Sequence, residues 1–139
     1  VDVLIVGGGP FGLMIANELG RRGVTAALVD AKPSTAFNPQ ANATQARTME
    51  HYRRLGFADE VRALGLPPDF PTDIAYFTRF AAHELARFPL PSAREARSRD
   101  GAAASWSGPE LPHRVAQKYV EQVLRRQAEA LDGISVRFG

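Results

Sequence analysis

Residues 1–33 read VDVLIVGGGPFGLMIANELGRRGVTAALVDAKP, and this stretch decides the fold. The apolar, β-branched run Val3–Val6 predicts a strand of a parallel sheet that is buried on both faces. A helix is predicted from Phe11 to about Arg22, and a second strand over residues 25–30. A strand, a helix and a strand within about thirty residues predict a right-handed βαβ unit, and therefore an α/β fold.

Three glycines lie between the first strand and the helix. Gly7, Gly9 and Gly12 have the G-x-G-x-x-G spacing that binds dinucleotides in this structural context. The first glycine permits a tight turn, the second lets the backbone approach a pyrophosphate, and the third lets helix and strand pack closely. Pro10 and Phe11 lie at the start of the predicted helix, which directs its first backbone N–H groups and its positive dipole end toward the phosphates. We therefore assign all five residues to a predicted dinucleotide site.

An acidic residue ends the second predicted strand. Asp30 lies eighteen residues beyond Gly12, where a carboxylate can accept hydrogen bonds from adenosine ribose hydroxyls and would repel a 2′-phosphate. Ala31 and Lys32 follow it and join the predicted site, although Lys32 is equally compatible with a solvent-exposed position. The pattern favours an adenine dinucleotide with a free ribose over a merely structural glycine turn. Spacing alone leaves both FAD and NAD open.

The rest of the chain predicts further elements and one long loop. We expect helices over 45–55, 58–64 and 115–131, an antiparallel hairpin with strands 74–80 and 84–88, and a final strand over 134–138. Residues 89–112 are rich in Pro, Ser, Ala, Gly and Arg and predict a loop that is either functional or mobile. Gln117 falls on the apolar face of the 115–131 helix, where its amide needs a polar partner.

Composition excludes several classes of function. The chain has 139 residues, 45% of them hydrophobic and 23% charged, which is typical of one soluble domain. A net charge of +2 gives no reason to expect nucleic acid as a partner, and the absence of cysteine excludes disulfides and thiolate chemistry. His51, His83 and His113 show no metal-ligand spacing. No apolar run reaches the ~20 residues of a membrane helix, so we expect no membrane partner and a cytoplasmic protein.

Three segments resemble the FAD-dependent aromatic hydroxylases, the single-component flavoprotein monooxygenases that include phenol and p-hydroxybenzoate hydroxylases. The first is DVLIVGGGPFGLMIANELGRRGV, over residues 2–24. The second, QARTMEHYRRLGF over 45–57, is similar to the family's R-T-x-E-x-x-R-x-x-G helix. The third, LPHRVAQKYVEQVLRRQA over 111–128, is similar to its Q-x-x-x-E-x-x-L helix. The second and third segments make the resemblance specific.

The resemblance implies a Rossmann-like FAD-binding domain with FAD as cofactor, NAD(P)H as co-substrate, and a small aromatic substrate hydroxylated with O₂. It implies that Arg47 reaches the FAD near its pyrophosphate and ribose, and that Gln117 contacts the cofactor. Helical periodicity by itself places Arg47 in solvent. The residues present would hold the cofactor, and we assign no catalytic residue and no metal ligand among them. Two departures from the family pattern are present. Gln40 stands where relatives often carry Arg, so one basic contact is expected to be missing, and Asp30 stands where they often carry Glu, which keeps NAD open.

We expect residues 1–139 to form the N-terminal part of such a domain, incomplete at the C-terminus and inactive by itself. The hairpin and loop over 72–112 would reach toward a substrate domain. A homodimer is one option for the full-length protein. Two alternatives stay open: an NAD-dependent dehydrogenase, and a non-catalytic binding module with a flavoprotein-like fold. Within flavoenzymes, a reductase or cyclase with the same N-terminal unit is a further option.

Overall fold

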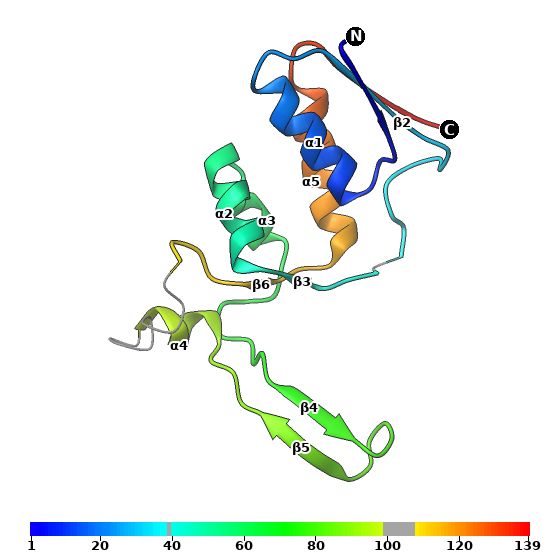
Figure 1. Cartoon of the computed structure of the whole chain (residues 1–139). Coiled ribbons are helices and arrows are strands. Elements are labelled where there is room, and N and C mark those ends of the chain that lie inside the picture. The colour runs from blue at the N-terminus through cyan, green and yellow to red at the C-terminus, as the bar shows by residue number, and fades with distance from the viewer. Residues whose placement is uncertain (39, 99–107) are drawn as a thin grey trace.

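A parallel sheet and two helices form the main body of the protein. The computed structural model describes residues 1–38, 40–98 and 108–139. Strands β1 (Val3–Val6), β2 (Ala26–Asp30) and β7 (Ile134–Phe138) form a parallel sheet in the order β1-β2-β7. Helix α1 (Pro10–Gly20) connects β1 to β2, and α5 (Gln117–Glu129) leads into β7 and packs beside α1 (Figure 1). The predicted βαβ unit and the α/β class are confirmed.

Two short helices extend the apolar core. Helix α2 (Ala46–Leu55) and helix α3 (Ala58–Ala63) follow each other, with Gly56 in the left-handed conformation (φ +89°) between them. Their apolar side chains pack in one cluster with those of α1, α5 and the sheet. The fully buried large members of this cluster are Leu13, Leu28, Met49, Leu55, Val61, Val123 and Leu124.

Strand β1 differs from its prediction. Ile5 is buried against the helices, but Leu4 is 63% exposed and Val6 is 80% exposed. Helices α1 and α5 pack against the face of β1 that carries Ile5. The opposite face, which carries Leu4 and Val6, has no layer over it among the described residues. The expectation of a strand buried on both faces is therefore wrong for this part of the chain.

A very short antiparallel ladder was not predicted. Strand β3 (Ala43–Thr44) pairs with β6 (His113–Arg114), although about seventy residues separate them. Neighbouring backbone bonds extend the contact, since the N–H of Gln117 donates to the carbonyl of Ala41 at 2.8 Å. A strand of two residues shows no periodicity, so sequence patterns do not reveal it. The ladder fixes the start of α5 beside the segment that leads into α2.

The predicted hairpin is present and stands apart from the main body (Figure 1). Strands β4 (Ile74–Phe77) and β5 (Glu84–Phe88) pair antiparallel. The first strand ends earlier than expected because the chain turns at Thr78, whose N–H donates to the carbonyl of His83 at 3.0 Å. Both strands are largely exposed in the described structure.

Part of the predicted long loop is helical. Helix α4 (Ala93–Ser98) begins after Ser92, whose Oγ accepts a hydrogen bond from the N–H of Glu95 at 3.3 Å. The Glu95 carboxylate in turn accepts from the N–H of Ser92 at 2.9 Å. This reciprocal pair is a capping box, and its S-x-x-E spacing was visible in the sequence. The prediction of a loop over 89–112 is thus wrong for α4, and its residues 99–107 lie outside the described part of the structure.

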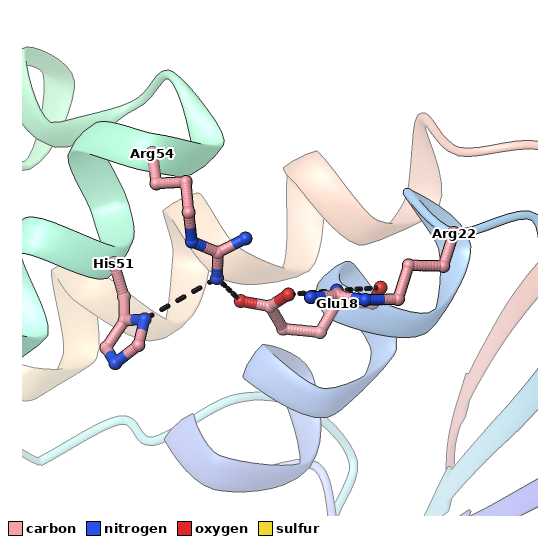
Figure 2. Close-up of polar contacts among 4 residues, drawn as sticks. All are labelled: Glu18, Arg22, His51 and Arg54. Carbon is pink, nitrogen blue, oxygen red and sulfur yellow. Dashed lines mark hydrogen bonds and ion pairs between the residues drawn. The ribbon is translucent and has the colours of Figure 1, made fainter.

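A polar contact joins α1 to α2 on the surface. Figure 2 shows Glu18 of α1 accepting hydrogen bonds from Arg22, which lies just after that helix, and from Arg54 of α2. The Arg54 guanidinium also lies 3.5 Å from Nδ1 of His51. Partial burial opposes ionisation of Glu18, but the two arginine hydrogen bonds outweigh it, so the pKa of Glu18 lies below its usual value.

Glu18→Gln is expected to lower the free energy of unfolding by up to about 1 kcal/mol, because partly exposed ion pairs contribute little. A depressed pKa means that this contribution is present above the ordinary value of 4.5 and is lost as the pH falls below it. Urea denaturation at low and high salt measures the effect, which should shrink as salt screens the charges. Glu84→Gln, which removes an ion pair confined to the hairpin, is the control. An unchanged urea midpoint in E18Q at low salt would contradict the prediction.

Among the described residues, no helix is both long enough and apolar enough to cross a membrane.

Candidate functional site

The three glycines of the predicted motif differ in their steric surroundings. Gly7 has φ +112°, a left-handed conformation that favours glycine, and its N–H donates to the carbonyl of Val29 at 2.8 Å. A Cβ at Gly12 would lie 1.9 Å from the carbonyl oxygen of Gly7, so only glycine allows α1 to approach the turn this closely. A Cβ at Gly9 would meet no heavy atom within 4 Å. Gly9 therefore faces open space at the N-terminus of α1, where it is also the N-cap residue.

Asp30 holds this turn through both carboxylate oxygens. Its Oδ1 accepts a hydrogen bond from the N–H of Lys32 at 2.8 Å, and its Oδ2 accepts from the N–H of Gly8 at 2.6 Å. The hydrogen bond from Lys32, and after it the one from Gly8, hold the pKa of Asp30 below its ordinary value. The G-x-G-x-x-G spacing did not point to Gly8. In the structure a Cβ at this position would lie 2.6 Å from the ring of Phe138. The acid is thus ionised at neutral pH and anchored beside the glycine turn.

A small cavity lies at the carboxyl ends of β1 and β2. It has a volume of about 110 Å³. The predicted site residues that line it are Gly9, Pro10, Asp30, Lys32 and Gln117. Residues that the sequence did not suggest also line it, among them Gly8, Ala36 and Glu121. The structure therefore brings together the glycine turn, the strand-end acid and the start of α5, as expected for a ligand site at this edge of a parallel sheet.

Five of the predicted residues lie outside the lining of this cavity. Gly7 and Gly12 determine the conformation of the turn and its close contact with α1, and neither lines the cavity. Phe11 is 86% exposed, and Ala31 is exposed directly after Asp30. The Arg47 side chain is 82% exposed and forms an ion pair with Glu50 at 2.7 Å, as helical periodicity indicated. Contacts of these residues with a ligand stay predictions.

Gln117 has the polar partner that its position required. Its Nε2 donates to Oε1 of Glu121 at 2.7 Å, one helical turn further along α5. Glu121 is only 2% exposed, and its Oε2 accepts a hydrogen bond from the N–H of Ala36 at 2.6 Å. The sequence analysis missed Glu121, although the Q-x-x-x-E spacing that places it next to Gln117 was visible.

The chemistry of the cavity suits the binding of a polar ligand. The N-terminus of α1 presents the positive end of its dipole, with no acidic residue in the first turn. Ionised Asp30 is an acceptor for hydroxyl groups, and Gln117 adds an amide. No group of three or more His, Asp or Glu side chains in the described ranges could hold a metal ion. Phosphates at the helix end and sugar hydroxyls at the acid fit this arrangement.

Comparison with known proteins identifies the family. A family model described as an FAD binding domain matches residues 1–139. The chain belongs to this family of FAD-binding domains. The resemblance noted in the sequence is confirmed, and FAD is favoured over NAD as the dinucleotide.

The relatives are FAD-dependent monooxygenases. Phenol 2-monooxygenase of Pseudomonas sp. (strain EST1001) is 33% identical over 127 residues, which cover 91% of this chain and 20% of that protein. The 2,4-dichlorophenol 6-monooxygenase of Cupriavidus pinatubonensis is 35% identical over 137 residues, covering 99% of this chain and 22% of that protein. Among solved structures, the flavin-dependent monooxygenase PieE in complex with FAD and substrate superimposes with a TM-score of 0.84 at 32% identity, covering 100% of this chain and 24% of that one. The chain thus spans about a fifth of the length of its curated relatives.

Proposed function

We propose that this FAD-binding domain belongs to a flavoprotein monooxygenase that hydroxylates a phenolic or other aromatic substrate. O₂ would be the oxygen donor and NAD(P)H the reductant, in a cytoplasmic enzyme. One observation carries the proposal. Gly9, Asp30 and Gln117 are far apart in the sequence and line one cavity, in a chain whose relatives include a phenol and a dichlorophenol monooxygenase.

The described residues fit the parts of FAD. The open face of Gly9 and the N-terminus of α1 would receive the pyrophosphate, and ionised Asp30 would accept hydrogen bonds from the adenosine ribose. Gln117 would hold a further polar group of the cofactor, with Lys32 beside the adenosine. When bound, the flavin supplies the electron transfer and the reaction with O₂, while the protein binds and orients it. The chain by itself would be inactive, because its residues are cofactor holders.

The hairpin supports the proposed organisation. Ile74, Tyr76, Phe77 and Phe88 are all exposed on strands β4 and β5, although large apolar side chains are usually covered. We propose that the segment 72–112 reaches toward a substrate domain, against which these side chains would pack. Residues 1–139 would then form the N-terminal part of the FAD-binding domain of the whole enzyme.

The first experiment is an absorption spectrum. The longest natural polypeptide that contains this chain is purified gently, its visible spectrum is recorded, and the protein is then denatured. We expect the yellow flavin spectrum and the release of FAD, followed by phenol-stimulated consumption of NAD(P)H. A colourless protein that also takes up no added FAD would contradict the proposal, and would favour the dehydrogenase or the binding module.

A further inference from the structure

Glu121 is a buried carboxylate whose bonds need an explanation. It lies on α5, is almost completely shielded from solvent, and has no Lys, Arg or His as an ion-pair partner among the residues that the structure describes. A carboxylate in such a place loses its hydration and persists only if hydrogen bonds replace it. An apolar side chain would fill the same space without that cost. The position therefore points to a role beyond packing.

The two hydrogen bonds that the structure describes for Glu121 come from residues that line the small cavity at the carboxyl ends of β1 and β2. Its Oε2 accepts a hydrogen bond at 2.6 Å from the N–H of Ala36, which lies in the segment that follows β2 and Asp30. Its Oε1 accepts a hydrogen bond at 2.7 Å from Nε2 of the Gln117 side chain. Ala36, Gln117 and Glu121 all line this cavity. One carboxylate thus ties together two sides of the cavity that are 85 residues apart in the sequence.

The packing of the helices has its own polar contact. Nδ2 of Asn17 on α1 donates to the carbonyl of Leu124 on α5 at 2.8 Å and to that of Leu13 at 2.9 Å. This bond joins α1 and α5 directly in the core. Glu121 is therefore not the polar contact that joins these two helices, and its two bonds serve the cavity.

We propose that Glu121 is a positioning residue of the FAD site. It holds the Gln117 amide with the nitrogen directed toward Glu121 and the carbonyl oxygen turned away from it, and it fixes the segment around Ala36 at the same time. The inference rests on the proposed function, because FAD is the ligand that Gln117 would meet. Glu121 itself acts through Gln117.

Glu121→Gln tests this role without changing the size of the side chain. The new amide has one acceptor oxygen and one NH₂ donor. The backbone N–H of Ala36 can only donate, so the oxygen stays there and the NH₂ group faces Gln117. The Gln117 amide must then rotate to offer its oxygen, which reverses the group presented to FAD. We expect the dissociation constant of FAD to rise about tenfold, the loss of roughly one hydrogen bond between Gln117 and FAD.

The measurement is a titration of the apoprotein with FAD, followed by flavin fluorescence, in the longest natural polypeptide that contains this chain. Glu121→Gln, Gln117→Leu and the double variant form a cycle, with thermal unfolding of each apoprotein recorded beside it. If Glu121 acts through Gln117, both single variants weaken FAD binding and the double variant weakens it no further than Gln117→Leu does. Glu60→Gln, which changes a carboxylate that contacts Arg126 and Gln127 of α5, is the control and should bind FAD normally.

Other outcomes overturn the inference. If E121Q binds FAD as the wild type does, or if its effect persists in full on the Gln117→Leu background, Glu121 has no positioning role through Gln117. If E121Q does not fold, normal FAD affinity in Gln117→Leu alone overturns the inference. A wild-type protein that takes up no FAD removes the proposed function itself, and this result is distinct from the other three.

Discussion

Gly12→Ala is expected to lower the free energy of unfolding by about 3 kcal/mol, at the upper end for overpacking a tight contact. The added Cβ would lie 1.9 Å from the carbonyl oxygen of Gly7 and 3.3 Å from Cγ2 of Ile5. The oxygen belongs to the backbone of the turn, so it cannot move aside as the end of a flexible side chain could. Relief would require α1 to shift away from β1 and the sheet. Urea denaturation followed by circular dichroism measures the change.

Gly9→Ala is the matched control for this variant. Gly9 has φ −79° and ψ −174°, which any residue adopts, and its Cβ would point into open space. We expect normal stability in Gly9→Ala, together with weaker FAD binding because the methyl group would occupy the space before the pyrophosphate. Equal stability of the Gly12 and Gly9 variants would contradict the close packing of α1 against the turn.

The features that the sequence predicted well depend on local rules. The strand before Gly7, the helix after it and the strand that ends at Asp30 follow from an apolar run, a glycine spacing and a helical period. The placement of Gln117 on an inward face follows from the same periodicity, and the structure supplies the polar partner that it needed. Even the exposure of Arg47 follows from its place on the α2 helix.

The features that were missed depend on segments far apart in the chain. A Cβ at Gly8 would meet the ring of Phe138 of β7, and nothing near Gly8 in the sequence reveals that contact. Glu121 accepts a hydrogen bond from the N–H of Ala36, which lies 85 residues earlier in the sequence. A helical wheel places Glu121 on the inward face with Gln117, but it does not show the partner 85 residues away that accounts for a carboxylate there. Site residues that close a cavity between two segments are thus the least visible in a single sequence.

The error on β1 has a different origin. An apolar run indicates that a strand can be buried on both faces, and Leu4 and Val6 are apolar as expected. Whether both faces are covered depends on layers contributed by other segments. Helix α4 was missed for a simpler reason, since its composition indicated a loop and the capping box at Ser92 was not weighed.

Asp30→Ala is expected to raise the dissociation constant of FAD about 100-fold, through the loss of hydrogen bonds worth roughly a factor of ten each. The carboxylate has one bond to Gly8 and one to Lys32, and it keeps acceptor capacity for ribose hydroxyls. Since hydrogen bonds from Lys32 and Gly8 hold its pKa below the ordinary value, Asp30 is ionised between pH 5 and 8 and adds no pH dependence to FAD binding in that range. Titration of the apoprotein with FAD at several pH values measures both effects.

Two controls separate the ribose contact from the support of the turn. Asp132→Ala removes an exposed carboxylate from the turn before β7, at the opposite edge of the sheet, and should bind FAD normally. FMN lacks the adenosine ribose, so loss of that contact should weaken FAD far more than FMN in Asp30→Ala. Equal weakening of both ligands would show that Asp30 acts only by holding Gly8 and Lys32. Unchanged FAD affinity would show that the ribose assignment is wrong.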